Sequence, residues 1–180
     1  MFRRTLLALP LVLAASFATA QTPAAPKTDP DSTVYLDTKD GRVVIRLRPD
    51  LAPKHVAQIK ALVKRGFYDG TVFHRVIPGF MAQGGDPTGT GTGGSNLANI
   101  PSEFTVEPFK RGTLGMARAA DPNSANSQFF INFADNHFLN GQYTVYGRVI
   151  SGMEFVDAIT RGEPPREPDR MLSVKVAADA

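Results

Sequence analysis

Short runs of alternating apolar and polar residues, separated by turns rich in glycine and proline, constrain this fold more than any other feature of the sequence. The segment TVYLDTKDGRVVIRLRPD contains two such runs around the turn KDG, and in the second run Val43, Ile45 and Leu47 share one face. Comparable runs follow at TVFHRVI, FMAQ, GTLGMARA, SQFFINF, YTVYGRVI and RMLSVKVAA. We therefore predict a mainly β domain in which an antiparallel sheet closes on itself.

Two segments carry helical periodicity instead. In APKHVAQIKALVKRG, apolar residues recur at helical spacing between Pro53, which suits a first turn, and Gly66, which suits the end of a helix. A shorter helix is predicted in SGMEFVDAITRG, where the apolar stripe consists of Met153, Val156 and Ile159. Many short strands in hairpin order with only two helices indicate an antiparallel sheet closed on itself.

The first residues have the pattern of a secretory signal peptide. A basic MFRR precedes the apolar run TLLALPLVLAASF and then ATAQ, which offers a small-residue cleavage site after Ala20. The apolar run is about 13 residues long and contains Pro10, whereas a membrane-spanning helix needs roughly 20 residues. We therefore predict export and cleavage, with no stable membrane insertion afterwards. Arg3 and Arg4 leave both the general and the twin-arginine export routes open.

The length of 180 residues accommodates one well-filled domain. We divide the chain into a signal peptide at 1–20, a flexible mature N-terminus rich in proline and alanine at 21–32, and one folded domain at 33–178. The predicted location is the periplasm, with secretion as the second choice. Because the chain has no cysteine, it forms no disulfide and uses no thiolate chemistry.

The charge of the chain argues against a nucleic-acid partner. The net charge is +3, but two arginines lie in the predicted signal peptide, which leaves 18 basic against 17 acidic residues in the mature chain. The sequence also has no run of lysine and arginine and no basic stretch interleaved with aromatic residues. We expect a monomer that does not bind nucleic acid.

Motifs for nucleotide, metal or hydrolase chemistry are incomplete. Gly89, Gly91 and Gly94 have dinucleotide-binding spacing, but Pro101 prevents a long helix after them, so the lip of a site is the favoured interpretation. The three histidines are His55, His74 and His137. Their spacing does not suit metal ligands, so we favour structural or surface roles and predict no metal site. A hydrolase is disfavoured because no G-x-S-x-G nucleophile elbow is present.

The segment SQFFINF places an unusual set of residues on one strand face. Alternation directs one set to the core: Phe129, Ile131 and Phe133. The opposite face carries Gln128, Phe130 and Asn132. An aromatic residue between two amides indicates either a binding surface or a cross-strand packing partner. The same alternation puts Met81 and Gln83 on a common face.

Together these segments resemble the cyclophilin family of peptidyl-prolyl cis-trans isomerases. The resemblance covers roughly Val34 to Val176 and is carried by FHRVIPGFMAQGGD, GTGGS, GTLGMARAADPNSANSQFFINFADNHFLNG and YTVYGRVISGMEFVDAI. It implies a closed eight-stranded antiparallel β-barrel capped by two α-helices. The departures from the family pattern look like those of its bacterial exported branch.

The resemblance also implies the site residues. Arg75 matches the active-site arginine, with Gln83 beside it as a second catalytic residue. The proline pocket is expected at Phe80, Met81, Phe130 and Leu139. Other substrate-binding residues are expected at Ala117, Arg118, Gln128, Phe138 and Tyr143. Ala117 and Arg118 belong to the segment that corresponds to the family's MANA motif, whose backbone contacts the residue before proline.

Three positions depart from the family pattern. Arg118 replaces a frequent asparagine, although a backbone role survives that change. Phe138 replaces a frequent tryptophan, so the resemblance leaves cyclosporin sensitivity open. Tyr143 replaces a histidine and keeps an aromatic wall with a polar tip.

The implied activity is isomerisation of X–Pro peptide bonds, with no covalent intermediate and no cofactor. The expected partners are proline-containing peptides and exported proteins that are unfolded or still folding. Two other classes stay open: a non-catalytic peptide-binding module on the same barrel, and a small-ligand β-barrel suggested by the glycine-rich stretch. The presence of Arg75 and of an apolar wall favours the enzyme.

Overall fold

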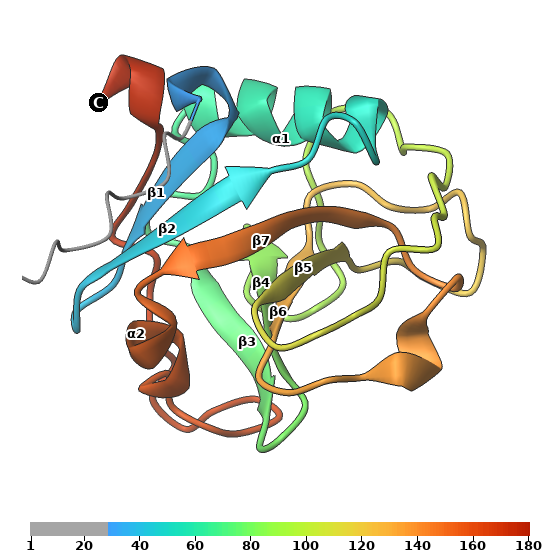
Figure 1. The fold of residues 1–180 in the computed structure, drawn as a ribbon. Helices are drawn as coiled ribbons and strands as arrows, with labels where there is room; N and C mark the ends of the chain where they lie inside the picture. Colours follow the sequence, from blue (N-terminus) through green and yellow to red (C-terminus); the bar gives the residue numbers. More distant parts are fainter. Residues whose placement is uncertain (1–28) are drawn as a thin grey trace, which may run out of the picture.

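The computed structural model describes residues 29–180, so the predicted signal peptide and most of the predicted flexible N-terminus lie outside the described residues. Eight strands form one sheet in the order β3-β4-β6-β5-β7-β2-β1-β8 (Figure 1). The strands are β1 (Thr33–Asp37), β2 (Arg42–Leu47), β3 (Val72–Ile77), β4 (Met81–Asp86), β5 (Thr113–Met116), β6 (Phe129–Asn132), β7 (Val145–Ser151) and β8 (Ser173–Val176). The helices are α1 (Pro53–Lys64), α2 (Met153–Asp157) and the 3-10 turns η1 (Pro30–Ser32), η2 (His137–Leu139) and η3 (Ala177–Asp179).

The sheet curls into a barrel that is not fully closed, so the prediction of a closed barrel was overstated. No ladder joins the edge strands β3 and β8 within residues 29–180; an isolated bridge between Val72 and Arg170 spans the seam instead. There the Phe73 N–H donates to the Asp169 carbonyl at 2.9 Å. Prolines lack the N–H that a ladder needs, and the segment before β8 contains three of them ahead of the bridge. These residues are Pro164, Pro165 and Pro168.

Strand alternation divides the apolar residues into two clusters. The larger cluster fills the inside of the curl and is covered by the apolar stripe of α1; it includes Phe129, Ile131 and Phe133. The smaller cluster contains Phe130 and Met81, whose side chains belong to the other face of β6 and β4. The split predicted for SQFFINF is therefore confirmed, and the second cluster is where a site can form.

Helix α1 covers one end of the curled sheet, and α2 lies towards the opposite end (Figure 1). The C-terminus of α1 has the Schellman pattern. Gly66 has a φ of +67°, its N–H donates to the Val63 carbonyl, and the Phe67 N–H donates to the Leu62 carbonyl. At the N-terminus, the Glu103 carboxylate from a distant loop accepts the backbone N–H groups of residues 54 and 55. The predicted ends of α1 are confirmed, whereas α2 ends at Asp157 and so does not include Ile159 of the predicted stripe. No described helix has the length and apolarity that crossing a membrane requires.

Candidate active site

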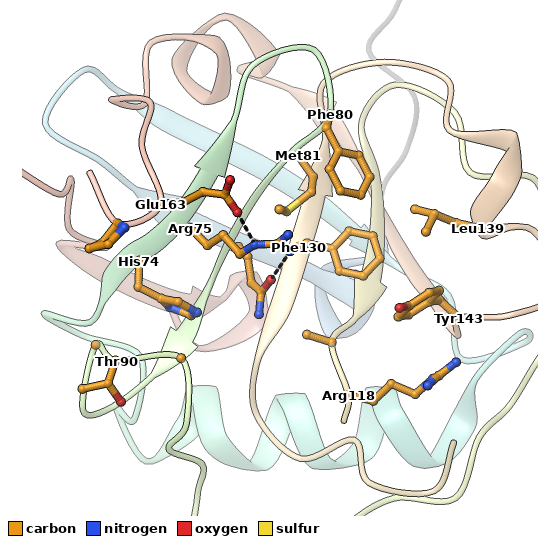
Figure 2. A pocket seen from close by; sticks show the side chains of 15 residues that line it. His74, Arg75, Phe80, Met81, Thr90, Arg118, Phe130, Leu139, Tyr143 and Glu163 are labelled. Carbon is orange, nitrogen blue, oxygen red and sulfur yellow. Dashed lines mark hydrogen bonds and ion pairs between the residues drawn. The ribbon is translucent and has the colours of Figure 1, made fainter. Parts of the chain in front are cut away.

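Arg75 lies on β3 directly opposite Gln83 on β4. The pairing of these strands is irregular between Phe73 and Arg75, and this bulge brings both His74 and Arg75 to the same pocket although they are neighbours in a strand. The Arg75 Nε donates to the Glu163 carboxylate at 2.7 Å, and Nη1 makes a longer contact of 3.5 Å with Gln83 Oε1. The guanidinium is thus held from two sides at the mouth of a pocket of about 480 Å³ (Figure 2).

Apolar side chains form the wall beside the arginine. Met81, Phe130 and Leu139 line the pocket and are no more than 5% exposed. The Phe130 ring is edge-on to Tyr143 and stacks on Phe109 behind it, both at 5.8 Å between ring centroids. Figure 2 shows Phe130 between Met81 and Tyr143, facing the space beside Arg75. This wall offers a dry surface for a small apolar ring.

The wall needs a glycine behind it. A Cβ atom at Gly115 on β5 would overlap the rings of Phe130 and Phe109. Gly115 is paired with Phe130 across β5 and β6. Close approach of the two rings to the backbone, rather than a positive φ, is therefore what this position requires.

A chain of amides connects the arginine to the glycine-rich loop (residues 87–95). Gln83 Nε2 donates to Gln128 Oε1 at 3.0 Å, and Gln128 Nε2 donates to the carbonyls of Gly91 and Gly93 at 3.0 and 2.8 Å. Each amide is a donor on one side and an acceptor on the other, which fixes its orientation. The Oε1 atom of Gln83 therefore faces Arg75.

Asp86 at the end of β4 organises the same loop. Its buried carboxylate accepts from the Thr88 N–H and hydroxyl, both at 2.8 Å, and from the N–H groups of Gly91 and Gly93 at 2.6 and 3.1 Å. Burial alone would raise the pKa of Asp86, but these hydrogen bonds outweigh it and lower the pKa to about 2. The glycines thus turn around a carboxylate of the protein itself. No helix begins directly after them, as a dinucleotide-binding motif would require.

We expect acid to destabilise the protein partly through Asp86. Because its pKa is lowered in the folded state, the stabilisation is complete well above pH 3.8 and is lost as the pH falls towards 2. The shift corresponds to about 2 kcal/mol of unfolding free energy. Urea unfolding between about pH 5 and pH 2.5 should show that Asp86→Asn, which lacks this ionisation, loses less stability on acidification than the parent chain. Parallel losses in the two proteins would contradict the assignment.

Arg118 forms the rim between this pocket and a second, more polar hollow. Its guanidinium lies 4.6 Å from the ring centroid of Tyr143, and it donates to the carbonyls of Ala119 and Gln142, each at 2.9 Å. The second hollow, about 560 Å³, shares Gln83, Gly91, Ala117 and Arg118 with the first. A groove therefore continues past the apolar wall.

The structure brings the predicted site residues together. The first pocket is lined by Arg75, Phe80, Met81, Gln83, Ala117, Arg118, Phe130, Leu139 and Tyr143. Gln128 lines the second hollow and supports Gln83. Phe138 is 65% exposed and reaches the site only at its edge, where its ring is 5.4 Å from that of Phe80. The individual roles of these residues stay predictions.

Sequence reasoning missed several lining residues. His74 is 6% exposed, has no hydrogen-bond partner on either ring nitrogen and lines the pocket, so it is not the satisfied structural or surface residue that was favoured. Burial lowers its pKa, and the Asp86 carboxylate opposes this effect. Thr90, Glu163 and Pro164 also line the pocket. The bulge in β3 could not be seen in the alternation pattern, and Glu163 is distant in sequence.

Fold and site define a class of protein: a curled antiparallel barrel that presents an arginine, amides and a ring-sized apolar wall on its outer face. Residues 33–176 match the model of the family "Cyclophilin type peptidyl-prolyl cis-trans isomerase/CLD". The chain belongs to the cyclophilin family of peptidyl-prolyl cis-trans isomerases (EC 5.2.1.8) and is an enzyme of that class.

Bacterial relatives and solved structures agree with this placement. A "Probable peptidyl-prolyl cis-trans isomerase" of Brucella suis is 53% identical over 99% of this chain and 98% of the relative. A peptidyl-prolyl cis-trans isomerase of Acinetobacter baylyi is 39% identical over 81% of this chain and 86% of the relative. A cyclophilin of Hirschia baltica has a TM-score of 0.79 at 34% identity, covering 85% of this chain and 76% of its own.

A further solved structure concerns a ligand. The cyclophilin-type isomerase of Cryptosporidium parvum, crystallised in the presence of the dipeptide Ala-Pro, has a TM-score of 0.75 at 32% identity. The similarity covers 80% of this chain and 98% of that one.

Proposed function

We propose that this enzyme isomerises X–Pro bonds in exported proteins while they fold, with Arg75 as the catalytic hydrogen-bond donor and without cofactor or covalent intermediate. The observation that carries the proposal is the Arg75 guanidinium held beside the apolar wall of the pocket. The X–Pro bond is the peptide bond with a substantial cis population, and its exchange takes tens to hundreds of seconds. Acceleration of this step is useful wherever chains must fold after export.

The chemistry follows from amide resonance. Rotation about a peptide bond has a barrier of about 18–20 kcal/mol because it disrupts the partial double bond. In the twisted state the nitrogen lone pair is localised and accepts a hydrogen bond that the planar amide accepts poorly. A donor directed at that nitrogen binds the transition state better than the substrate, which is the condition for catalysis. Arginine suits this role because it stays charged and its N–H groups form a rigid fork.

One hydrogen bond does not supply the whole effect. A charge-assisted hydrogen bond contributes about 1.5–3 kcal/mol, whereas a rate gain of about 10⁵ needs roughly 7 kcal/mol. We assign the remainder to fixing the proline ring against Met81, Phe130 and Leu139 and to excluding water, which strengthens the same hydrogen bond. A proline-containing ligand for this pocket is supported by the Cryptosporidium parvum relative, whose crystal structure was determined in the presence of the dipeptide Ala-Pro.

Export rests on the N-terminal sequence. The pattern of residues 1–20 supports a cleaved signal and a periplasmic location. Gln83 belongs to the proposed machinery as the group that supports Arg75, and the groove past Arg118 is proposed to take the peptide on one side of the proline.

A protease-free isomerisation assay on proline peptides tests the activity of the mature chain, and refolding of an exported protein limited by proline isomerisation tests its use. We expect both rates to rise with enzyme concentration and both to fall when Arg75 is replaced. Acceleration of peptide isomerisation without acceleration of refolding would refute the folding role while leaving the enzyme activity intact. Fractionation of cells producing the full chain should place the shortened protein outside the cytoplasm.

A further inference from the structure

Glu163 is the one carboxylate among residues 29–180 that forms a salt bridge with Arg75. The contact is made by Nε, on the side of the guanidinium, at 2.7 Å. Figure 2 shows Glu163 next to Arg75 on the side away from Phe130. A carboxylate at this place leaves the terminal nitrogen Nη1 free to contact Gln83 in the pocket.

The fold places Glu163 there by a backbone contact one residue away. The N–H of Val76 donates to the Gly162 carbonyl at 2.7 Å, and the N–H of Gly162 donates to the Val76 carbonyl at 2.8 Å. Arg75 and Glu163 are the residues adjacent to this pair, one on each chain segment. Arg161, which precedes Gly162, is held as well, because its guanidinium lies 4.0 Å from the centroid of the Phe133 ring.

The chain on the other side of Glu163 is also anchored. Asp169 is 6% exposed, accepts the Thr160 N–H at 2.7 Å and forms a salt bridge of 2.6 Å with Lys39. The two ends of the loop 161–168 are therefore tied to the body of the protein. The backbone that carries Glu163 is therefore anchored on both sides, and its half-exposed side chain starts from a fixed position beside Arg75.

We propose that Glu163 is a positioning residue that fixes the plane of the Arg75 guanidinium for the rotating imide. The inference rests on the proposed catalytic role of Arg75. A long arginine side chain that is 44% exposed has several rotamers to choose from. A side-on carboxylate at Nε selects one of them before substrate arrives and so raises the fraction of productive encounters.

Position and charge make opposite predictions for the same variants. If Glu163 acts by position, a glutamine that retains a hydrogen-bond acceptor keeps most of the activity, and alanine does not. If the carboxylate mainly weakens the field of the guanidinium, both substitutions increase kcat. The comparison of Glu163→Gln with Glu163→Ala therefore separates the two effects.

The kinetic test uses the full mature chain and a proline peptide assay. We expect Glu163→Ala to lower kcat about three- to tenfold with little change in KM, and Glu163→Gln to restore at least half of the loss. Glu167→Ala, an exposed glutamate of the same loop without a salt bridge in residues 29–180, serves as the matched control and should leave both constants unchanged. Unchanged or increased kcat in Glu163→Ala would overturn the proposal.

A double-mutant cycle separates this inference from the proposed function. In an Arg75→Ala background, Glu163→Ala should cause no further loss, because there is no guanidinium left to position. Full activity of Arg75→Ala would refute the proposed function itself; an inactive Arg75→Ala beside a fully active Glu163→Ala would refute the inference alone. As a readout apart from activity, the Nε–H resonance of Arg75 in NMR spectra should shift and exchange faster in Glu163→Ala, and an unchanged signal would contradict the contact.

Discussion

Replacement of Arg75 by alanine is expected to lower kcat/KM by about 10²- to 10³-fold, the effect of removing one donor aimed at charge that develops in a transition state. The loss should lie mainly in kcat, because the apolar wall that binds the proline ring is unchanged. Stopped-flow or NMR exchange experiments on a proline peptide, without a coupled protease, give both kcat and kcat/KM.

Controls for this variant follow from its surroundings. Arg75 is exposed and its salt bridge with Glu163 lies at the surface, so the unfolding free energy should change by no more than about 1 kcal/mol. Arg75→Lys keeps a charge without the planar fork and should recover only part of the activity. Arg166→Ala, which removes an exposed arginine from the loop 161–168, should leave activity unchanged. If Arg75→Ala turned over peptide at the normal rate, Arg75 would have no part in the mechanism.

Replacement of Phe130 by alanine is expected to weaken peptide binding itself. The ring is 5% exposed, lies in the pocket wall and contacts both Tyr143 and Phe109, so its removal takes away the surface on which a proline ring would rest. We expect the dissociation constant of a proline peptide, measured by NMR titration, to rise more than about tenfold, since burial of such apolar surface contributes about 1.5–3 kcal/mol. Stability should fall by about 3–5 kcal/mol, as for other buried phenylalanines.

Phe109→Ala is the matched control for Phe130. Phe109 is fully buried in the same cluster and stacks behind Phe130, but it does not line the pocket. Its removal should cost similar stability and a smaller part of the affinity. Equal losses of affinity in the two variants would show that collapse of the cluster, not the exposed face of Phe130, controls binding. An unaltered affinity in Phe130→Ala would place the proline site elsewhere.

Local patterns in the sequence were enough to predict the elements and the division of the core. Alternation separates Phe129 from Phe130, and the structure assigns them to different clusters because successive side chains of a strand point to opposite faces. Pro53 and Gly66 mark the ends of α1 because their backbone preferences suit a first turn and a left-handed C-terminus. The composition of the pocket, by contrast, came from the resemblance to a family.

Tertiary structure decided what depends on contacts between distant segments. The seam between β3 and β8 is closed by an isolated bridge from the segment before β8, a contact between distant segments that the alternation of neither strand predicts. His74 joins Arg75 at the pocket because a bulge interrupts the alternation of β3. Glu163 meets Arg75 across 88 residues of sequence because a backbone bridge ties their neighbours together. A linear pattern records the faces of each strand, whereas the partner that a charged side chain finds depends on how the sheet curls.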